Sequence, residues 1–501
     1  MNIYSFEPFG YEGSLVTVEV DLRRGIPAVD IVGLADGAVR EMRKRAKSAI
    51  KNSGYEFPME RVLISLSPAD LKKENAMHDL AITTGIITEN EKENFINEKV
   101  LVIGEVELSG RIRSVRAVHA AVSSAFSAGI RYAVVPKENL LEAKEIKGMK
   151  ICGVENLSDA LEALKDEKLF EESNVDIEES ESSSVSFPEN DEVALSDGME
   201  LPENFVRAIE IAVAGKHSLI AVGRPGCGKT LAIQSLIPAI TPNLTFEESQ
   251  SVTRIHSIAG LMRADTSYIK APSFRIPHQT SSIEGMCGGG LNCRPGEVSL
   301  AHNGFLFLDE AAEFKSSVLQ MLRVPLENGT ITLCRAGRST VYPAKFQLIM
   351  ATNPCPCGNY GSKERICLCS EKSIQQYWSK FSAPLIDRIG LISFVSDDEK
   401  KVKVNLSELR KHIKQAFEIQ RKFGTYNNYL SPQELLSKFN ADKESEKILD
   451  SYIQDNSVSV RRAASIRKIA LTIANMEGRE NVLPYDVREA ISYSKPFHSE
   501  L

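Results

Sequence analysis

A chain of 501 residues is long enough for about two to four domains. Hydrophobic residues make up 43% and charged residues 25%, the balance of a globular protein, and no apolar run approaches the ~18 residues of a membrane-spanning helix. Residues 166–200 carry thirteen acidic side chains and one lysine, so the rest of the chain, out of a total of −7, carries +5. This mildly basic remainder permits a polyanionic partner without requiring one.

The first residues, MNIYSFEPFGYEG, lack a basic region followed by an apolar core, so we predict no secretory signal and expect a cytoplasmic protein. Nine cysteines in such a chain indicate reduced thiols or metal ligands rather than disulfides. Residues 1–165 contain a strand pattern at 15–22, a helix pattern at 36–54 and the apolar strand YAVVP. They are predicted to form a mixed α/β domain.

An acidic, serine-rich segment, residues 166–200, divides the chain. It cannot bury enough apolar surface to offset the entropy of ordering, so we predict a flexible linker. Beyond it, helices alternate with three apolar strands, HSLIAVG, GFLFLDE and FQLIMATN. This alternation is typical of a largely parallel sheet. We therefore assign residues 201–396 to an α/β core and residues 397–501, which have helical periodicity, to a C-terminal helical domain.

The first of these strands leads into GRPGCGKT, which fits the phosphate-loop pattern G-x-x-x-x-G-K-[ST] and opens the helix TLAIQSLI. Its glycines let backbone N–H groups approach phosphates, and the helix N-terminus adds a positive dipole. Lys229 is expected to reach the β- and γ-phosphates of ATP, and the Thr230 hydroxyl to bind Mg²⁺. The predicted nucleotide-binding residues are Gly223, Arg224, Pro225, Gly226, Cys227, Gly228, Lys229 and Thr230.

Polar residues also follow the other two strands. Asp309 and Glu310 end GFLFLDE; Asp309 is predicted to hold Mg²⁺ and Glu310 to orient and deprotonate the attacking water. Asn353 ends FQLIMATN, at the carboxyl edge of a parallel sheet, where it can hydrogen-bond the γ-phosphate or the water. An asparagine before a proline also forms turns, so a purely structural role for Asn353 is the alternative.

Just after this strand, Cys355, Cys357, Cys367 and Cys369 form the pattern C-x-C-x9-C-x-C. Four thiolates can hold one Zn²⁺ tetrahedrally as a structural site. These pairs are tighter than the commoner C-x2-C pairs, and chance cysteines in a loop are the alternative, whereas a redox pair would favour C-x-x-C. We predict a structural zinc site that braces the region after Asn353.

The following segments occur in order along the chain: GRPGCGKT, VTRIHSIAGL, FRIPHQT, RPGEVSLAHNGFLFLDE, PLENGTIT, ATNPCPCG and PLIDRI. With VEVDLRRGIPAVDIVGLADGAVRE near the N-terminus, they resemble the ComM/YifB family of magnesium-chelatase-like AAA+ ATPases over nearly the whole chain outside the acidic linker. The resemblance implies an AAA+ core with a C-terminal helical lid, preceded by a Lon-protease-like α/β domain. It also implies ATP and Mg²⁺ as cofactors.

Further residue roles come from this resemblance. Asn353 matches the sensor-1 position, and Arg388, in SAPLIDRI, matches the arginine finger that reaches the ATP of a neighbouring subunit. Arg461, in SVSVRRA, matches sensor 2 in the helical lid. A finger of this kind implies a ring of subunits, usually a hexamer. Considered without the resemblance, each arginine fits a surface ion pair.

Two segments resemble elements that line the pore of such rings. Residues 288–298 resemble the helix-2 insertion, and residues 330–346 predict a β-hairpin with Arg335 and Arg338 near a glycine-containing tip. In related ring helicases a hairpin at this place touches the DNA backbone, which makes the two arginines candidate DNA contacts. A solvated hairpin without a partner is the alternative.

Lon proteases use a serine activated by a lysine, but this chain has Met77 and His119 at the matching places. Neither restores the dyad, so no peptidase activity is expected. The resemblance implies an ATP-driven motor on branched or single-stranded DNA, with branch migration during natural transformation as the family's known role. Two alternatives stay open: a chelatase-like motor that remodels a protein partner, and a nucleotide-gated assembly protein that moves no strand.

Overall fold

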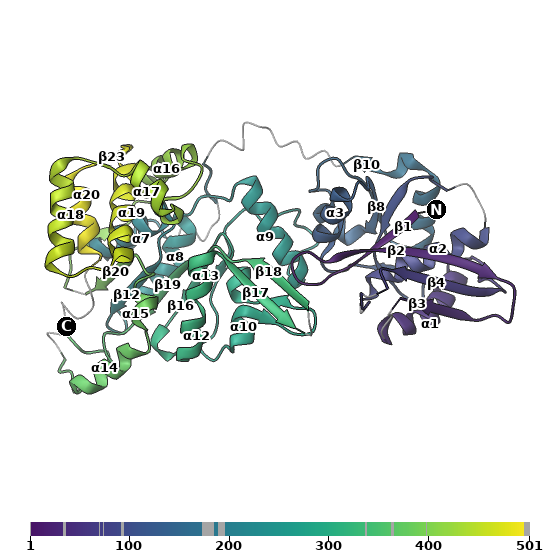
Figure 1. Ribbon diagram of the computed structural model, residues 1–501, viewed down its shortest axis with the longest axis horizontal. Coiled ribbons are helices and arrows are strands. Elements are labelled where there is room, and N and C mark those ends of the chain that lie inside the picture. The colour runs from purple at the N-terminus through teal and green to yellow at the C-terminus, as the bar shows by residue number, and fades with distance from the viewer. Residues whose placement is uncertain are drawn as a thin grey trace.

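A computed structural model describes residues 2–33, 37–69, 71–73, 75–91, 95–172, 185–188, 196–335, 338–361, 365–396 and 398–494. An N-terminal sheet domain, a central domain with the phosphate loop and a C-terminal group of helices follow one another along its long axis (Figure 1). Among the described residues, no helix is both long and apolar enough to cross a membrane.

The N-terminal domain is built on an eight-stranded mixed sheet in the order β10-β9-β8-β5-β1-β2-β4-β3. Its strands are β1 (Asn2–Glu7), β2 (Ser14–Arg23), β3 (Val29–Val32), β4 (Arg61–Ser67), β5 (Lys99–Val102), β8 (Tyr132–Pro136), β9 (Lys150–Val154) and β10 (Glu171–Glu172). Its α-helices are α1 (Gly37–Asn52), α2 (Asp79–Glu91), α3 (Val118–Ser127), α4 (Leu140–Ala143) and α5 (Leu157–Lys165). Three short 3-10 helices are η1 (Ala76–His78), η2 (Lys137–Asn139) and η3 (Glu167–Leu169). A separate two-stranded sheet consists of β6 (Glu105–Val106) and β7 (Ile112–Arg113). The predicted mixed α/β domain is confirmed.

Two apolar residues of the predicted linker pack against the neighbouring domains. Phe170 is buried and meets Tyr132 edge-on, with 5.2 Å between the ring centroids. Val185 belongs to the apolar core of the central domain. Phe170 and Val185 are thus packed on the two domains, and the bounds of the linker stay a prediction. Residues 173–184 and 189–195 of that linker lie outside the described residues.

The central domain contains a five-stranded sheet in the order β13-β16-β19-β12-β20, in which every neighbouring pair is parallel. Its strands are β12 (Leu219–Gly223), β13 (Phe274–Arg275), β16 (Phe305–Leu308), β19 (Gln347–Thr352) and β20 (Leu391–Val395). Every residue of β12, β16 and β19 is buried, as their uninterrupted apolar sequences predict. The predicted parallel sheet is thus confirmed, with β13 and β20 as two further strands.

Helices cover this sheet, and shorter elements project from it. The helices are α7 (Glu203–Gly215), α8 (Lys229–Ile240), α9 (Phe246–Ala259), α10 (Ile283–Cys287), α11 (Glu297–Leu300), α12 (Ser316–Met321), α13 (Arg323–Asn328), α14 (Glu371–Ser379) and α15 (Ala383–Ile386), with the turn η4 (Ala311–Glu313). The segment 288–298 contains a small ladder, β14 (Gly288–Gly289) with β15 (Arg294–Pro295). The hairpin predicted at 330–346 is confirmed as β17 (Thr330–Arg335) and β18 (Arg338–Pro343), and its predicted tip, 336–337, lies outside the described residues.

The C-terminal part starts with a strand rather than a helix. β21 (Lys401–Lys403) pairs antiparallel with β11 (Glu200–Pro202), and residue 397, the predicted boundary, lies outside the described residues. The helical lid follows as α16 (Leu406–Lys422), η5 (Asn427–Tyr429), α17 (Pro432–Lys438), α18 (Lys443–Asp455), α19 (Val460–Met476) and α20 (Pro484–Ser492), with a short ladder of β22 (Asn440–Ala441) and β23 (Asn481–Val482). Lid residues such as Ile466 and Ile469 share one apolar core with α7 and β12, so the lid and the sheet form one packed body.

Candidate active site

The phosphate loop lies at the carboxyl end of β12, between this strand and α8. Gly228, with a φ of 80°, adopts a left-handed conformation that turns the chain into α8, which begins at Lys229. The Lys229 side chain is buried, and its Nζ donates to the carbonyl oxygens of Gly223 at 2.7 Å and Arg224 at 2.8 Å. The ammonium group is therefore held within the loop, where it can reach a phosphate at the N-terminus of α8.

Oxygen ligands for a magnesium ion converge at the same edge of the sheet. Thr230 Oγ1 donates to Asp309, at 3.0 Å from Oδ1 and 3.1 Å from Oδ2. Asp309 follows β16, which is one strand away from β12 across β19. Mg²⁺ prefers one or two protein oxygens together with phosphate oxygens and water. The hydroxyl and carboxylate present here fit that ion and the predicted role of both residues.

Glu310 has an unusual backbone conformation beside these ligands. Its φ of 49° and ψ of 48° are left-handed, which a non-glycine residue adopts only when the surrounding structure imposes it. Its amide donates to Asp309 Oδ1 at 3.0 Å, and its carboxylate accepts a hydrogen bond from Gln279 Nε2 at 2.5 Å. Gln279 is not among the predicted site residues, although it lies in FRIPHQT, one of the segments that carry the family resemblance. Its contact with the predicted general base makes it part of the site.

Asn353 follows β19, the strand between β12 and β16. The next loop rests on the phosphate loop: a Cβ at Gly358 would come within 2.6 Å of Pro225 Cδ and 4.0 Å of Asn353 Cγ. Only a residue without a side chain permits this approach. The structure thus gathers the following predicted residues at the carboxyl edge of the sheet: Lys229, Thr230, Asp309, Glu310 and Asn353.

The four cysteines lie in this same loop, and their Sγ atoms are all within 4.8 Å of one another. The separation is 3.4 Å between Cys355 and Cys357, 3.7 Å between Cys355 and Cys367, and 3.6 Å between Cys357 and Cys367. Four thiolates about 2.3 Å from one Zn²⁺ would stand ~3.8 Å apart in a tetrahedron. The donor set, completed by Cys369, therefore fits a structural zinc ion.

Helix α14 ties the far end of the cysteine loop back to the sheet. Thr352 Oγ1 and the Tyr377 hydroxyl are 3.0 Å apart, and Trp378 Nε1 donates to the Pro354 carbonyl at 3.0 Å. Both rings are buried, and burial raises the pKa of Tyr377. The loop therefore leaves and rejoins the protein body next to Asn353.

Arg388 and Arg461 lie at the other edge of the sheet. Arg388 precedes β20, whose first residue, Leu391, is paired with Leu219, the first residue of β12. The phosphate loop follows the last residue of β12, so the length of this strand, roughly 13 Å or more at ~3.3 Å per residue, separates the two edges. Arg461, at the start of α19, lines the same cavity as Arg388. Neither arginine therefore stands beside Lys229 of its own chain.

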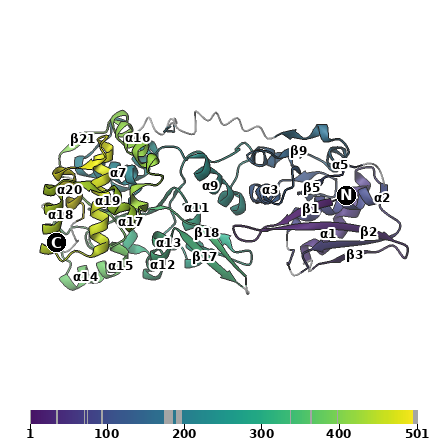
Figure 2. The same ribbon diagram turned by 45° about the horizontal axis from the view of Figure 1, so that its top comes forward.

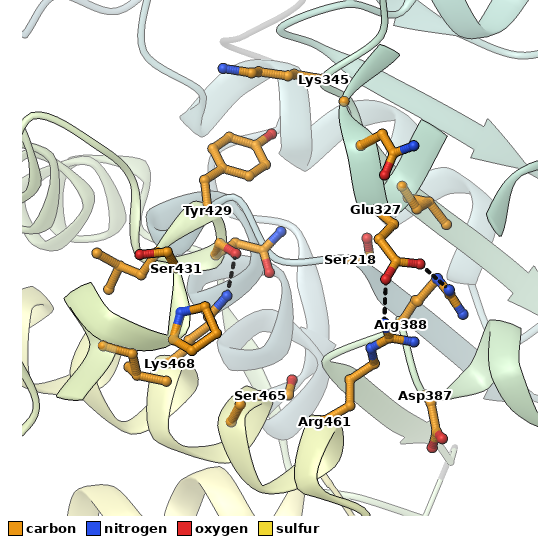
Figure 3. A pocket seen from close by; sticks show the side chains of 18 of the residues that line it. Ser218, Glu327, Lys345, Asp387, Arg388, Tyr429, Ser431, Arg461, Ser465 and Lys468 are labelled. Carbon is orange, nitrogen blue, oxygen red and sulfur yellow. Dashed lines mark hydrogen bonds and ion pairs between the residues drawn. The ribbon is translucent and has the colours of Figure 1, made fainter. Parts of the chain in front are cut away.

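A cavity of about 800 Å³ between the central domain and the lid contains both arginines (Figure 3). Glu327, near the end of α13, lies between them: one carboxylate oxygen accepts from Arg388 Nη2 and the other from Arg461 Nη2 at 2.5 Å. Hydrogen bonding from Arg388, and the positive charge of both arginines, hold the pKa of Glu327 below its usual range. The ion pair considered for each arginine thus exists, with one carboxylate shared by the two.

The hairpin arginines are in contact with different partners. Arg335 and Arg338 face each other across β17 and β18. Arg335 is half exposed and has a nitrogen 4.0 Å from a carboxylate oxygen of Glu284. The Arg338 guanidinium stacks on the ring of Phe9, 3.5 Å from its centroid. Arg338 is therefore covered by the N-terminal domain, whereas Arg335 faces solvent.

The β1–β2 turn of the N-terminal domain reaches this hairpin, as two views of the ribbon show (Figures 1 and 2). The Tyr11 amide donates to Thr340 Oγ1 at 3.0 Å, and the rings of Tyr11 and Tyr342 are 5.8 Å apart. Arg254 in α9 donates to the Tyr11 carbonyl at 3.0 Å. The turn is thus bound to both the hairpin and α9.

Met77 and His119, which the resemblance to Lon-like domains places at the positions of the catalytic dyad, are both buried. Met77 lies in the N-terminal core, and His119 Nε2 is 2.6 Å from Gln250 Oε1 of α9, in the central domain. Burial lowers the pKa of His119 to about 4. The Ala117 amide donates to the Ser257 carbonyl at 3.0 Å nearby. His119 therefore lies in a contact between the N-terminal and central domains.

A strand, a phosphate loop and a helix, in a parallel sheet with acidic residues after a neighbouring strand, define a P-loop ATPase. Three protein-family models match the chain. "Magnesium chelatase, subunit ChlI" matches residues 199–403, "Subunit ChlI of Mg-chelatase" matches residues 18–139, and "Magnesium chelatase, subunit ChlI C-terminal" matches residues 405–494. The class is therefore that of the magnesium-chelatase-like AAA+ ATPases.

Individual relatives match this chain over most or nearly all of its length. Competence protein ComM of Haemophilus influenzae is 31% identical over 506 residues, which cover 98% of this chain and 96% of the relative. Uncharacterized protein YifB of Escherichia coli is 32% identical over 506 residues, with the same coverage. An uncharacterized protein of Mycobacterium tuberculosis is 39% identical over 384 residues, 76% of this chain and 74% of the relative. The chain belongs to the ComM/YifB family of magnesium-chelatase-like proteins.

Proposed function

We propose that the protein is an ATP-hydrolysing AAA+ ring motor, a hexamer, that acts on DNA and migrates branched duplexes. The observation that supports a ring is the division of the predicted catalytic groups between opposite edges of one sheet. In a head-to-tail ring the arginine edge of one subunit meets the phosphate-loop edge of the next. The ATP site is then completed only by two adjacent subunits.

Each residue at the carboxyl edge has one task in this mechanism. Lys229 stabilises charge on the β- and γ-phosphates, and Thr230 and Asp309 would hold Mg²⁺. Glu310 takes the proton of the attacking water, which Asn353 orients. From the adjacent subunit, Arg388 and Arg461 stabilise charge on the transferred phosphoryl group, a contribution worth about 10³–10⁵ in rate for a finger in trans.

Mixed rings test whether both arginines act on the adjacent subunit. We expect the Arg388→Ala protein and the Arg461→Ala protein each to be inactive alone. The two proteins are then mixed, and ATP turnover of the mixture is measured. If both arginines act in trans, the mixture stays inactive, because no subunit presents both arginines to its neighbour. A mixture of Arg388→Ala with Glu310→Gln recovers turnover, because some interfaces combine an intact Glu310 with an intact Arg388. Recovery in the first mixture would instead mean that Arg461 serves the ATP of its own chain.

The action on DNA is supported by the β17–β18 hairpin and by the competence relative. Arg335 is half exposed at the described end of β17, and cations in this position suit a phosphate track. ATP turnover by successive subunits would move such hairpins along a strand. Arg338 joins the track only when its stacking on Phe9 is released.

Branch migration of a four-way DNA junction measures this function directly. The wild-type protein with ATP and Mg²⁺ should resolve the junction, and Glu310→Gln should bind ATP without resolving it. Glu313→Gln, an exposed glutamate three residues away, is the matched control and should retain activity. ATP turnover that is the same with and without branched or single-stranded DNA would refute the DNA motor, and would leave remodelling of a protein partner or nucleotide-gated assembly.

Zinc is proposed as a structural component of the same site. Held by Cys355, Cys357, Cys367 and Cys369, the ion would fix the loop that rests on Pro225 and follows Asn353. It would perform no chemistry. Less than about half a zinc per chain, in protein purified without chelator and with reduced thiols, would count against the site.

The position of the loop gives this zinc site a specific consequence. The double variant Cys355→Ser, Cys357→Ser should weaken ring assembly or cooperative hydrolysis more than ATP binding. Cys152→Ser, a half-buried cysteine of the N-terminal sheet, is the control and should change neither. Equal losses of ATP binding and assembly in the double variant would indicate general misfolding instead.

A further inference from the structure

Glu327 joins three segments that are far apart in the sequence. It comes from α13, whereas Arg388 follows α15 and Arg461 lies in the first turn of α19. Each of its carboxylate oxygens accepts a hydrogen bond from a different guanidinium group, so both oxygens are used (Figure 3). Two guanidinium groups that share one planar anion reproduce the way in which arginines bind a phosphate.

The positive charge around the Glu327 carboxylate favours an anion that carries more negative charge than a carboxylate does. The cavity is lined by four cationic residues, Arg388, Arg461, Lys345 and Lys468, and by two carboxylates, Glu327 and Asp387. Like charges brought together in this way repel one another unless an anion lies between them. Glu327 supplies one negative charge, whereas a nucleotide phosphate carries more and has additional acceptor oxygens.

We propose that Glu327 is a positioning residue that holds Arg388 and Arg461 together by occupying the place of the phosphate that both bind in an assembled ring. A phosphate and a carboxylate cannot use the same N–H donors, and their charges repel. The terminal phosphate of the adjacent subunit's ATP must therefore displace Glu327. The Glu327 side chain is 46% exposed, so it can turn into solvent when it is displaced. This inference rests on the proposed ring.

The replacement of the Glu327 carboxylate by a phosphate also affects the subunit concentration at which the ring assembles. In a subunit without a neighbour, the arginines are paired and do not bind stray phosphates. In the ring, the cost of breaking the two ion pairs of Glu327 with Arg388 and Arg461 offsets part of the arginine–phosphate attraction. Neutralising Glu327 should therefore strengthen assembly, whereas loss of an ordinary stabilising ion pair should weaken it.

The test compares wild type with Glu327→Gln, which keeps the shape and one acceptor oxygen but removes the charge. We measure ATP turnover against subunit concentration and expect the half-maximal concentration to fall at least ~3-fold in the variant. Glu444→Gln, a lid glutamate paired with Arg488 on the surface, is the matched control and should not shift it. An unchanged or higher half-maximal concentration for Glu327→Gln overturns the proposal.

A second measurement does not depend on the ring. In a Lys229→Ala background, which weakens phosphate binding at the phosphate loop, calorimetry measures the binding of inorganic pyrophosphate. Adding Glu327→Gln should tighten that binding about tenfold, and adding Arg388→Ala and Arg461→Ala should abolish the gain. No gain would overturn the role of Glu327. If the gain appears in this background while the wild-type protein hydrolyses ATP as a monomer, the role of Glu327 is kept and the ring is refuted.

Discussion

The arginines of the lid cavity, Arg388 and Arg461, and those of the hairpin, Arg335 and Arg338, are both predicted to meet phosphates, but their surroundings differ. The cavity arginines converge on the carboxylate of Glu327. The hairpin arginines have separate partners, since Arg338 stacks on the ring of Phe9 and Arg335 lies near the exposed Glu284. Only the first pair is arranged as an anion site.

The difference lies in which parts of the protein make the contacts. Glu327 and the cavity arginines belong to the body formed by the sheet and the lid, so their arrangement is fixed by one apolar core. Arg338 is held by a residue of another domain. Each of the two domains contributes an apolar side chain to the core of the other. Ile258 of α9 belongs to an apolar core of the N-terminal domain, and Tyr11 packs against an apolar core of the central domain. We infer that access to the hairpin arginines follows this docking, whereas the cavity arginines are organised in every subunit.

The largest expected effect separates the two pairs by ATP turnover without DNA. Arg388→Ala should lower turnover by about 10³-fold, because a finger contributes that much to phosphoryl transfer. Arg338→Ala should leave it within about 2-fold, because this residue stacks on Phe9 and is not among the residues predicted to contact the nucleotide. Steady-state ATP hydrolysis at saturating protein measures both. Equal losses in the two variants would erase the distinction between the pairs.

The second effect is a pH dependence of the docking. Burial lowers the pKa of His119 to about 4 from an ordinary value of 6.5, so the docked state disfavours the proton that the unfolded state binds. Stability should therefore fall as the pH decreases from about 6.5 towards 4, with a loss of ~2 kcal/mol from this group at pH 5. Burial raises the pKa of Glu142, which accepts from the His119 amide, and this opposes the effect.

Chemical unfolding at pH 7 and pH 5 measures this dependence, and His119→Gln isolates it. The variant keeps a polar partner for Gln250 and removes the titrating ring, so its stability should fall less on acidification than that of the wild type. The same fall in both proteins would show that His119 does not control the pH response.

Local features of the site were accessible to prediction from the sequence. The phosphate loop is a contiguous strand–loop–helix unit, and Asp309 and Asn353 directly follow apolar strands, so spacing alone orders these residues at one edge. The parallel sheet is predicted by three uninterrupted apolar segments that alternate with helices. β20 escaped prediction because its five residues, LISFV, are too few to distinguish a strand from a buried helical turn.

Contacts between distant segments were not accessible in the same way. Glu327 lies in PLENGTIT, one of the segments that carry the resemblance, but it is 61 residues from Arg388 and 134 from Arg461, and the sequence does not indicate which residues it contacts. Gln279 meets Glu310 only because β13 and β16 are neighbours in the sheet. The family resemblance gave roles to the arginines, but only the tertiary arrangement shows that they share one carboxylate.

A smaller effect concerns DNA affinity. Arg335→Ala should reduce the dependence of DNA binding on salt by ~0.7 to 0.9 in the logarithmic slope, the contribution of one phosphate contact. Arg338→Ala should change it less, because the stacking on Phe9 competes with the phosphate. Fluorescence anisotropy with a single-stranded and a branched DNA over a salt series measures both slopes. A larger change for Arg338→Ala would mean that the hairpin is already released in solution.

The smallest expected effect comes from removing the cover of Arg338. Phe9→Ala leaves the guanidinium without its ring, a contact worth about 0.5–1 kcal/mol at partly exposed sites, so DNA affinity should rise roughly 2- to 5-fold. Phe126→Ala is the matched control, because Arg131 stacks on that ring within the N-terminal domain, away from the hairpin. The gain should vanish when Phe9→Ala is combined with Arg338→Ala. A gain that survives in the double variant would come from a general loosening of the N-terminal domain, and Arg338 would then have no part in binding DNA.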